Sequence, residues 1–420
     1  MADNVAEEKV DFGKSTYGKQ SANCHKEAVK LKTVFEPGRE IPVAAETDIL
    51  VVGGGTAGLP AALAAARSGA DVLLLERYGY VGGASTGGLV ITLPADRQGV
   101  ITRELEERLR ELGGAAAMEN DWLAWCPEML KWLGLKMLEE SKVKMLFHSW
   151  CVGCVTADDK IDGVIIESKA GRQVIKAKVV VDCTGDADIA AFAGAPYVKG
   201  DEDGKMQEVT MMFMMSNLDE KRFKSGKPLS QPPKRMHSRM TYIYPGYLNV
   251  WGGRIGDIDG TNPWDLTRAE NELRKQVFEW ALWAKQNMPG CEEAYISMTA
   301  PQLGVRETRR IVGEYRLSKA DWDAKTIFPD HIGFAYVDKS IPYRAILPQK
   351  VENLLVAGRC VSADRDILDP IRLIPPCMVT GYAAGVAAAL AVQDDTTPRQ
   401  LDVGKLQAFL RKNDVTFPSR

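Results

Sequence analysis

The feature that most constrains this chain is the stretch 48–77, which reads DILVVGGGTAGLPAALAAARSGADVLLLER. It begins with a short, nearly continuous apolar run, the pattern of a strand buried on both faces. Glycines follow in the order G-x-G-x-x-G, and from Gly58 an Ala-rich run is typical of a helix. Residues 71–75 are expected to form a second buried strand, which ends at Glu76. A strand, a Gly-rich turn, a helix, a second strand and an acid in this order predict a dinucleotide-binding site.

The glycines and the acid each have a separate physical task in such a site. Gly53 permits the tight turn, Gly55 lets the backbone approach a pyrophosphate, and Gly58 lets the helix pack closely against the strand. The helix N-terminus adds free N–H groups and a partial positive charge. Glu76 stands where a carboxylate accepts hydrogen bonds from ribose hydroxyls. The alternative is a Gly-rich turn with a purely structural role, but the order of the features favours the dinucleotide site.

The composition is typical of a globular enzyme. The 420 residues are 45% hydrophobic and 26% charged, so the chain can bury the core of two or three domains. The formal net charge is −3, so the chain lacks the excess of positive charge that binding to nucleic acid or an anionic membrane favours. The apolar run 375–392 is long enough to span a bilayer, but its Ala and Gly content favours a buried helix. We therefore expect neither a nucleic-acid partner nor a membrane span.

Cysteine usage and the start of the chain bear on the cellular compartment. The chain has eight cysteines, and its first residues lack both an apolar signal core and a twin-arginine signal. Reduced thiols and a cytoplasmic location are expected. Cys151 and Cys154 form a C-x-x-C, which admits a redox or metal site. Because no second C-x-x-C follows and the pair lies in a strand pattern, structural cysteines are favoured and no metal site is predicted.

The chain divides into four segments. Residues 1–45 are polar and aperiodic, an N-terminal extension that is either draped on the surface or an interaction arm. Residues 46–194 and 341–420 predict the two parts of one α/β, Rossmann-like domain, with a parallel sheet covered by helices. Residues 195–340 predict an inserted, mainly β substrate or cap domain. Within this frame we expect strands through 143–182 and helices at 103–112, 127–140, 266–286 and 376–392.

Two further segments are expected to return to the dinucleotide site from the first half of the chain. Residues 82–88 form a second Gly-rich loop, which a nicotinamide-binding protein does not need. A flavoprotein needs backbone there, against the isoalloxazine ring and the pyrophosphate; the alternative is a mobile surface loop. Residues 184–186 then turn from a buried strand into a helix whose N-terminus Asp186 and Asp188 can cap.

A third segment comes from the end of the chain. A strand ends at Gly358, and a loop leads to the helix that begins at Pro376. Proline suits the first turn of a helix. The N–H groups and positive dipole of that N-terminus are a device that stabilises an anionic reduced flavin.

Taken together, these motifs resemble the FAD-dependent oxidoreductases of the glutathione-reductase-like superfamily. The resemblance includes Ala62 and Gly69 in register with the first glycines, GVRETRRIVGEY at 304–315, IPYRAILP at 341–348 and LLVAGRCVSA from 354. More closely, the chain resembles an FAD-dependent oxidoreductase family that is distantly related to the flavoprotein subunits of fumarate reductase and heterodisulfide reductase. The resemblance implies FAD. Non-covalent binding is expected because none of the four histidines lies in an attachment motif. The residues assigned to FAD binding are Gly53, Gly55, Thr56, Ala57, Gly58, Glu76, Arg77, Gly82, Gly83, Ala84, Ser85, Thr184, Gly185, Asp186, Gly358, Arg359, Pro376 and Cys377.

The chain departs from the family pattern at two places. Arg359 stands where many flavoproteins of the superfamily carry an Asp that binds ribityl hydroxyls. Residues 363–367 read ADRDI in place of the usual ATHEA, so the family's histidine near the flavin is missing. We therefore choose the catalytic candidates by their chemistry. The anion clamps are Arg306, Arg309, Arg344 and Arg365, and the proton-transfer groups are Tyr343 and Asp364.

Two alternatives to these assignments stay open. Arg306 and Glu307 could form a structural ion pair at the domain junction. The charges around Arg365 could pair with one another in a surface loop. On the sharper hypothesis, Arg365 replaces the family's histidine and binds an anionic or carbonyl-bearing substrate over the flavin ring.

The function predicted is transfer of a hydride between a small organic substrate and flavin N5. Because the chain has one nucleotide-binding pattern, a second electron donor or acceptor must come from elsewhere. The alternatives are a flavin electron-transfer subunit that needs a partner protein and a flavin-dependent catalyst of a net non-redox reaction. A homo-oligomer is compatible with each. The sequence leaves open the substrate, the direction of reaction, the electron partner, the oligomeric state and the role of residues 1–45.

Overall fold

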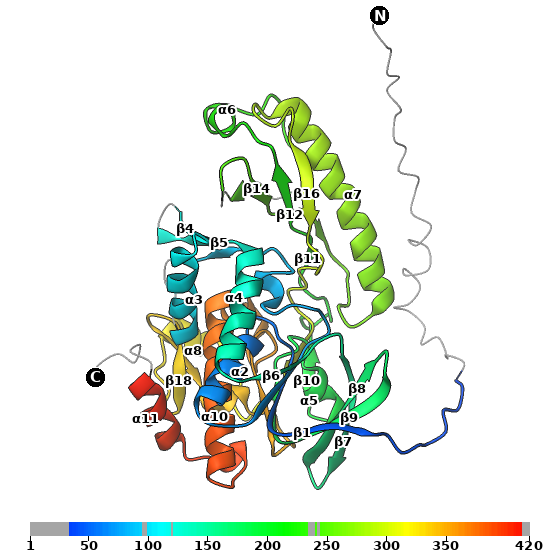
Figure 1. The fold of residues 1–420 in the computed structure, drawn as a ribbon, viewed down its shortest axis with the longest axis vertical. Coiled ribbons are helices and arrows are strands. Elements are labelled where there is room, and N and C mark those ends of the chain that lie inside the picture. The colour runs from blue at the N-terminus through cyan, green and yellow to red at the C-terminus, as the bar shows by residue number, and fades with distance from the viewer. Residues whose placement is uncertain (1–32, 95–98, 119–120, 234–239, 242–243, 414–420) are drawn as a thin grey trace, which may run out of the picture.

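The computed structural model describes residues 33–413 except 95–98, 119–120, 234–239 and 242–243. Two lobes make up the described chain, and they stand one above the other in Figure 1. The lower lobe is built on a large sheet and contains both ends of the described chain. The upper lobe contains the middle of the chain and carries the long helix α7 (Pro263–Asn287). Most of the predicted N-terminal extension, with Cys24 and His25, lies outside the described residues.

The lower lobe is organised by a seven-stranded sheet. The strand order is β6-β2-β1-β9-β8-β7, with β20 also paired to β9. Strands β6, β2, β1, β9 and β20 pair in parallel, whereas β9, β8 and β7 form an antiparallel meander. The strands are β1 (Val43–Val52), β2 (Val72–Leu75), β6 (Lys144–Leu146), β7 (Trp150–Ala157), β8 (Lys160–Ser168), β9 (Gly171–Asp182) and β20 (Leu354–Val356). The predicted α/β class with a parallel sheet and the strands expected through 143–182 are confirmed.

The register of this sheet brings three chain turns to one edge. Val52 of β1 and Val356 of β20 both pair with Asp182 of β9. The residues that follow these three strands therefore leave the sheet side by side. In open parallel sheets, the crevice outside the carboxyl ends of the strands is the place where ligands bind.

Alternate side chains of the central strands enter two different cores. Ile49 and Val51 of β1 pack in one core with helices of the lower lobe, and Leu50 and Val52 pack in another with β8 and β9. This burial on both faces explains why the strands read as continuous apolar runs. The helices of the first core are α2 (Gly58–Arg67), α3 (Val100–Glu111), α4 (Pro127–Glu140), α10 (Ile374–Gln393) and α11 (Val403–Asn413).

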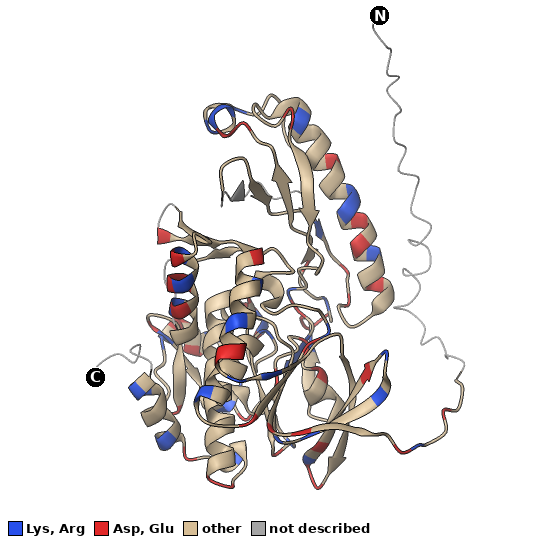
Figure 2. Ribbon diagram, in the orientation of Figure 1, with Lys and Arg blue, Asp and Glu red and all other residues tan. Residues whose placement is uncertain are grey.

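Helix α10 is the buried helix that its sequence predicts, and it begins two residues earlier than expected. It is the one helix in the described part of the chain that is long and apolar enough to cross a membrane, and 94% of its most apolar window is buried inside the protein. Figure 2 shows no charged residue along its middle, in contrast to α3 and α7. At Gly381 and Gly385 the helix comes so close to α2 that an added Cβ would lie 2.1 Å from the carbonyl oxygens of Ala57 and Ala61.

The upper lobe is an antiparallel sheet covered on one face by α7 (Figure 1). Its strand order is β13-β14-β12-β16. The core between sheet and helix includes Phe213 and Trp280, whose rings meet edge to face at 5.5 Å. The strands are β12 (Phe213–Ser216), β13 (Met240–Thr241), β14 (Leu248–Val250) and β16 (Tyr295–Thr299). This lobe falls within the predicted insertion, although its largest element is a helix.

Shorter elements join the two lobes and complete the lower one. A hairpin of β18 (His331–Tyr336) and β19 (Lys339–Pro342) packs against α10, so these residues lie in the lower lobe. The remaining elements discussed below are the 3₁₀ helices η1 (Gly83–Ser85), η3 (Tyr343–Ile346) and η4 (Arg365–Ile367), the helices α5 (Asp188–Phe192) and α9 (Leu368–Ile371), and the strands β3 (Thr92–Leu93), β11 (Val209–Thr210), β15 (Arg254–Ile255) and β17 (Arg309–Ile311).

The C-x-x-C pair lies in strand β7, as expected for structural cysteines. Cys151 and Cys154 both pair with residues of β8 in the antiparallel ladder. Burial raises the pKa of Cys154 to about 11, which disfavours a reactive thiolate. Within the described residues, no group of three or more His, Cys, Asp or Glu side chains could hold a metal ion.

A Gly→Ala substitution normally stabilises a helix, but the close approach of α10 to α2 predicts that it destabilises the protein at Gly385. We expect Gly385→Ala to lower the stability by about 1–3 kcal/mol, because the methyl group must displace the Ala61 carbonyl. Gly404→Ala, in the exposed first turn of α11, is the control: its added Cβ would lie 3.1 Å from the side-chain oxygen of Asp402, which can turn aside, so stability should change by less than about 1 kcal/mol. Denaturation midpoints of the two purified variants measure the difference. Equal midpoints would contradict the close contact.

Candidate active site

Two adjoining cavities open at the carboxyl edge of the sheet. The larger has a volume of about 610 Å³ and the smaller of about 80 Å³. Both are lined by residues from the first Gly-rich turn, the second Gly-rich loop, the turn after β9 and the upper lobe. The residues common to the two are Gly55, Gly83, Cys183, Thr184 and Gln302. The site is therefore elongated, and the predicted glycines lie at its centre.

The carboxylate of Glu76 forms part of the wall of the smaller cavity. Its Oε2 accepts a hydrogen bond from the Gly54 N–H at 2.7 Å, and its Oε1 accepts one from the Tyr78 N–H at 2.9 Å. Burial raises the pKa of Glu76, and these backbone N–H groups oppose the rise. The acid is thus held in place by the turn that it closes, which is the position expected of a ribose-binding carboxylate.

Arg77 lies at the rim of the same cavity between two aromatic rings. Its guanidinium is 4.8 Å from the Tyr78 ring centroid and 5.3 Å from that of Trp150. All three residues line the smaller cavity. Stacked aromatic and guanidinium planes are suited to contact a flat heterocycle.

The three glycines of the first turn have the geometry that their predicted tasks require. Gly53 has φ of 96°, and an added Cβ would lie 2.6 Å from the carbonyl oxygen of Cys183. At Gly58 an added Cβ would lie 1.7 Å from the Gly53 oxygen, so strand and helix pack without room for a side chain. At Gly55 the nearest atom is the Gly83 Cα at 3.9 Å. A side chain at Gly55 would project into the cavities, so this glycine leaves room for a ligand.

The second Gly-rich loop is docked on the first and is not a mobile surface loop. The Gly82 N–H donates to the Gly54 carbonyl at 2.8 Å, and the Thr56 hydroxyl lies 3.3 Å from that of Ser85. Ser85 is fully buried. Gly83 and Ala84, both in the 3₁₀ helix η1, line the larger cavity.

The turn after β9 is held by a buried carboxylate. Asp182 accepts hydrogen bonds from the Thr184 hydroxyl at 2.7 Å and from the Ala190 N–H at 3.0 Å. Burial raises the pKa of Asp182, and these donors oppose the rise. The prediction that Asp186 and Asp188 cap the following helix is wrong, because Thr184 accepts from the Asp188 N–H at 3.0 Å instead. Thr184 and Gly185 line the larger cavity.

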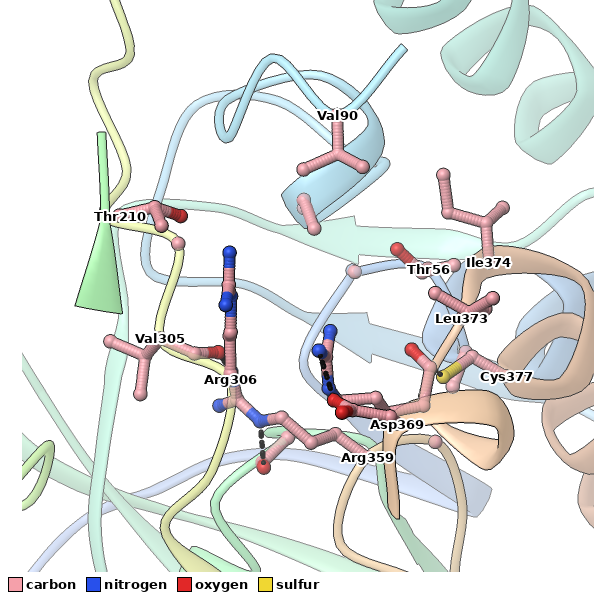
Figure 3. A pocket seen from close by; sticks show the side chains of 18 of the residues that line it. Thr56, Val90, Thr210, Val305, Arg306, Arg359, Asp369, Leu373, Ile374 and Cys377 are labelled. Atoms are coloured by element: carbon pink, nitrogen blue, oxygen red, sulfur yellow. Dashed lines mark hydrogen bonds and ion pairs between the residues drawn. The ribbon is translucent and has the colours of Figure 1, made fainter. Parts of the chain in front are cut away.

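Arg359 joins three segments around the larger cavity (Figure 3). Its Nε donates to the Gly185 carbonyl at 2.8 Å and its Nη2 to the Asp186 carboxylate at 2.5 Å. Its Nη1 donates to the carbonyl of Val305, in the segment that returns from the upper lobe. Arg359 is therefore a structural tie whose donors are already engaged by the protein.

The N-terminus of α10 lines the larger cavity through Ile374 and Cys377. It offers fewer donors than expected, because Pro375 and Pro376 carry no N–H and the Cys377 N–H bonds to the Leu373 carbonyl at 3.1 Å. Pro376 is not among the residues that line either cavity. Burial raises the pKa of Cys377 to about 12, so its thiol is neutral. The contribution of this helix end is its dipole.

The outer wall of the larger cavity comes from the upper lobe and from the segment around β3. It includes Gln302, whose side-chain Oε1 is buried and has no hydrogen-bond partner among the described residues. An orphaned buried acceptor of this kind requires a donor. The unpaired oxygen of Gln302 and the free space at Gly55 both fit a long ligand with hydrogen-bonding groups, such as FAD. The other residues of this wall are Val90, Thr92, Pro94, Trp122, Thr210, Met212, Trp251, Gly252, Arg254, Gly304, Val305 and Arg306.

Of the catalytic candidates, Arg306 lines the larger cavity. Arg365 does not, since its Nε lies 3.3 Å from the carboxylate of Glu307. Glu307 is fully buried and also binds the guanidinium of Arg310 and the Gln207 N–H. The alternative ion pair between Arg306 and Glu307 is therefore absent, and Glu307 pairs with Arg310 and Arg365 instead. The prediction that Arg365 lies over the flavin ring has no support in this arrangement.

The remaining candidates also lie outside the lining of both cavities. Tyr343 is buried in the lower core, where its hydroxyl donates to the Pro398 carbonyl at 2.8 Å and burial raises its pKa. Arg344 pairs with Asp330 at 2.9 Å, Asp364 with Arg316 at 2.7 Å, and Arg309 with Asp188 at 2.8 Å. These side chains are occupied by structural partners, of which Asp188 alone lines a cavity, the smaller one.

The structure adds residues that sequence reasoning missed. Gln302, Arg254 and Arg372 line the larger cavity, as does Asp369, the carboxylate partner of Arg372. Burial raises the pKa of Asp369, but the hydrogen bond and charge of Arg372, with smaller contributions from Gln207 and Arg306, together leave the pKa below its usual range. The charged loop after Gly358 signalled Asp369 and Arg372. Gln302 carries no signal in the sequence, because the fold of the upper lobe brings it to the site.

Similar proteins are consistent with an FAD site in this position of the fold. A family model described as FAD dependent oxidoreductase matches residues 48–338 and 336–410. The chain is 32% identical over 176 residues to a thiamine thiazole synthase of Methanococcus vannielii, a match that covers 38% of this chain and 64% of that protein. It is 30% identical over 161 residues to digeranylgeranylglycerophospholipid reductase 1 of Methanopyrus kandleri, over 36% of this chain and 42% of the relative. The chain thus spans about two fifths to two thirds of these curated relatives' length.

Among solved structures, the chain resembles a geranylgeranyl bacteriochlorophyll reductase-like protein from Thermoplasma acidophilum. The TM-score is 0.51 at 15% identity, with 88% of this chain and 84% of that chain covered. At this identity the likeness shows the fold alone.

The open space at Gly55 predicts a variant that folds but does not bind its cofactor. We expect Gly55→Val to lower the affinity for FAD about 100-fold or more, because the side chain fills the narrow part of the site. The melting temperature of the cofactor-free protein should change by less than about 2 °C. Gly38→Val, at an exposed glycine with nothing within 4 Å, is the control. Unchanged FAD binding in Gly55→Val would mean that the cofactor lies elsewhere.

Proposed function

The chain belongs to the FAD dependent oxidoreductase family, and from this premise we propose that it transfers a hydride between a small organic substrate and N5 of a non-covalently bound FAD. Bound FAD supplies the two-electron chemistry, and the protein binds, orients and shields the reactants. The substrate identity, the direction of transfer and the second electron donor or acceptor are not part of the proposal.

The observation that carries the proposal is the mixed wall of the larger cavity. One side is made by the turns that the fingerprint assigns to FAD, among them Gly55, Thr184 and Gly358. The opposite side is made by upper-lobe residues such as Met212 and Trp251, which belong to no cofactor motif. At about 610 Å³ the cavity is of the size that holds a drug-sized ligand. A substrate between the two sides would lie against the flavin ring.

The protein's own groups have distinct tasks in this proposal. Glu76 binds the ribose, and the N-terminus of α2 with Gly55 holds the pyrophosphate. The apolar side chains Trp122, Met212 and Trp251 exclude water from the reacting centre. Tyr343 and Asp364 lie away from the cavity, and Asp369, which lines it, is a weak base because its ion pair with Arg372 lowers its pKa, so we assign Asp369 to holding Arg372.

A flavin electron-transfer subunit that needs a partner protein is the second candidate. It is favoured by the outer strand of the large sheet, β7, where Trp150 is 57% exposed and Val152 and Val155 are also exposed. Trp150 also lines the smaller cavity, so a partner docked on this edge would lie near the predicted adenosine end of the site. No specific observation favours the non-redox alternative.

Non-covalent binding has its own test. In the described residues, His148 and His331 line neither cavity, and burial raises the pKa of the cavity thiols Cys183 and Cys377, which suppresses their nucleophilic thiolate form. We expect acid precipitation of the holoprotein to leave FAD in the supernatant, as measured by its absorbance. A yellow pellet that keeps its flavin after washing would contradict non-covalent binding.

Hydride transfer predicts reduction of the flavin by substrate alone. We expect at least one compound in a library of small organic acids, alcohols and amines to bleach the oxidised flavin band of the isolated chain under anaerobic conditions. If the chain runs as a reductase, the dithionite-reduced flavin should instead be reoxidised by an unsaturated acceptor. Flavin that responds to no small molecule in either direction, but exchanges electrons when a lysate fraction is added, would favour the electron-transfer subunit.

A further inference from the structure

Four arginines line the larger cavity, and three of them have carboxylate partners. Arg359 pairs with Asp186 at 2.5 Å, Arg372 with Asp369 at 2.6 Å, and Arg254 with Glu208 at 3.6 Å. Arg306 has no hydrogen bond or ion pair with any described residue. Among the described residues, four guanidinium groups and three carboxylates leave a surplus of one positive charge, and the carboxylates nearest Arg306, those of Asp369 and Glu208, are already paired with Arg372 and Arg254.

The surroundings of Arg306 make an uncompensated charge costly. Its guanidinium is partly buried, and burial lowers its pKa, as do the neighbouring guanidinium groups of Arg372 and Arg254. Arginine stays ionised at neutral pH in spite of such a shift. A charge that is partly removed from water and has no ion-pair partner is unfavourable. The arrangement therefore favours a ligand that brings the missing negative charge.

The Arg306 side chain points into the part of the larger cavity where we expect the substrate. Figure 3 shows Arg306 rising from the segment after Val305 into the cavity, between Thr210 and Val90. Arg306 does not line the smaller cavity, where the adenosine end of FAD is expected. The pyrophosphate already has the N-terminus of α2 and the open Gly55.

Much of this wall is apolar, although Thr92, Thr210, Gln302 and the paired Arg254 also belong to it. Val90, Met212, Trp122 and Trp251 line the cavity around Arg306 and offer no second full charge. A wall of this kind suits a hydrocarbon or aromatic body next to the charged group.

We propose that the substrate is an organic monocarboxylate with an apolar body, and that Arg306 binds its carboxylate. This inference rests on the proposed function, since it names the substrate class of the same cavity. A single unpaired guanidinium matches one carboxylate in charge, and its planar fork can donate two parallel hydrogen bonds to the two oxygens. A phosphate monoester is the weaker match because it carries nearly two negative charges at neutral pH. Arg306 is a specificity residue in this proposal.

The test is ligand binding to the FAD-loaded full chain, read from the perturbation of the flavin absorbance band. The probes are acetate, phenylacetate and 3-phenylpropionate, with the neutral amide of each as its matched partner and phenyl phosphate as the dianion. The variants are Arg306→Gln, Arg306→Lys and, as control, Arg274→Gln, at an arginine on α7 that pairs with Glu270 and lies outside both cavities. FAD content is measured for each.

We expect the aryl carboxylates to bind more tightly than their amides and than phenyl phosphate. Arg306→Gln should raise their dissociation constants at least about 30-fold, as expected for a lost charge-assisted pair. Arg306→Lys should recover part of the affinity, and Arg274→Gln should bind as the unmodified protein does. Amide binding and FAD content should be the same in all variants.

Four results would overturn the proposal. They are the absence of binding by every carboxylate up to about 10 mM, equal binding of amides and acids, tighter binding of phenyl phosphate, and loss of FAD in both Arg306 variants. The last result would assign Arg306 to the cofactor. Because the readout needs no turnover, failure of hydride transfer would leave it unaffected. Conversely, flavin reduction by neutral compounds with no carboxylate binding would remove the substrate class and leave the proposed function in place.

Discussion

The contact between helices α2 and α10 holds the site together. Because Gly381 and Gly385 have no side chains, the two helix backbones meet directly, and the N-termini of both helices reach the same cavity. Thr380 of α10 extends the contact to the turn after β20, since its hydroxyl accepts a hydrogen bond from the Gly358 N–H at 3.0 Å. The first and last parts of the lower lobe, which lie more than three hundred residues apart in sequence, are thereby fixed around one ligand position.

Charge is distributed unevenly around this position. The carboxylates of Asp182 and Glu76 are buried and accept hydrogen bonds from the turns at the edge of the sheet. Four arginines line the larger cavity, and three of them pair with carboxylates. The field in the cavity therefore favours anions without disturbing the turns that position the flavin. The junction cluster of Glu307, Arg310 and Arg365 is a separate network that ties the upper lobe to the lower one.

Much of the lower lobe can be predicted from the sequence because local rules agree with the tertiary structure there. Helix α4 spans Pro127–Glu140 as expected, and α10 departs from its predicted start by two residues. The glycines of the first turn are predictable because the local backbone leaves no place for a side chain, as the positive φ of Gly53 shows. Loop side chains are different. From the sequence, Arg365 is assigned to the substrate because it lies in the loop after Gly358. Its side chain instead pairs with Glu307, and the sequence could not show this because Glu307 belongs to a distant segment. The same holds for Tyr343, which its sequence places near the site and the structure places in the core. Gln302 could not be predicted at all.

The position of Gln302 has a consequence for folding as well as for binding. This residue comes from the segment that leaves the upper lobe, its N–H donates to the Gly87 carbonyl at 3.1 Å, and its side chain borders both cavities. A ligand that fills the site touches both lobes at once, so its binding free energy is added to their association as well as to the stability of each. Cofactor loading and lobe docking are then thermodynamically linked: the ligand-saturated protein unfolds as one cooperative unit, whereas the upper lobe separates from the lower lobe more readily when the site is empty.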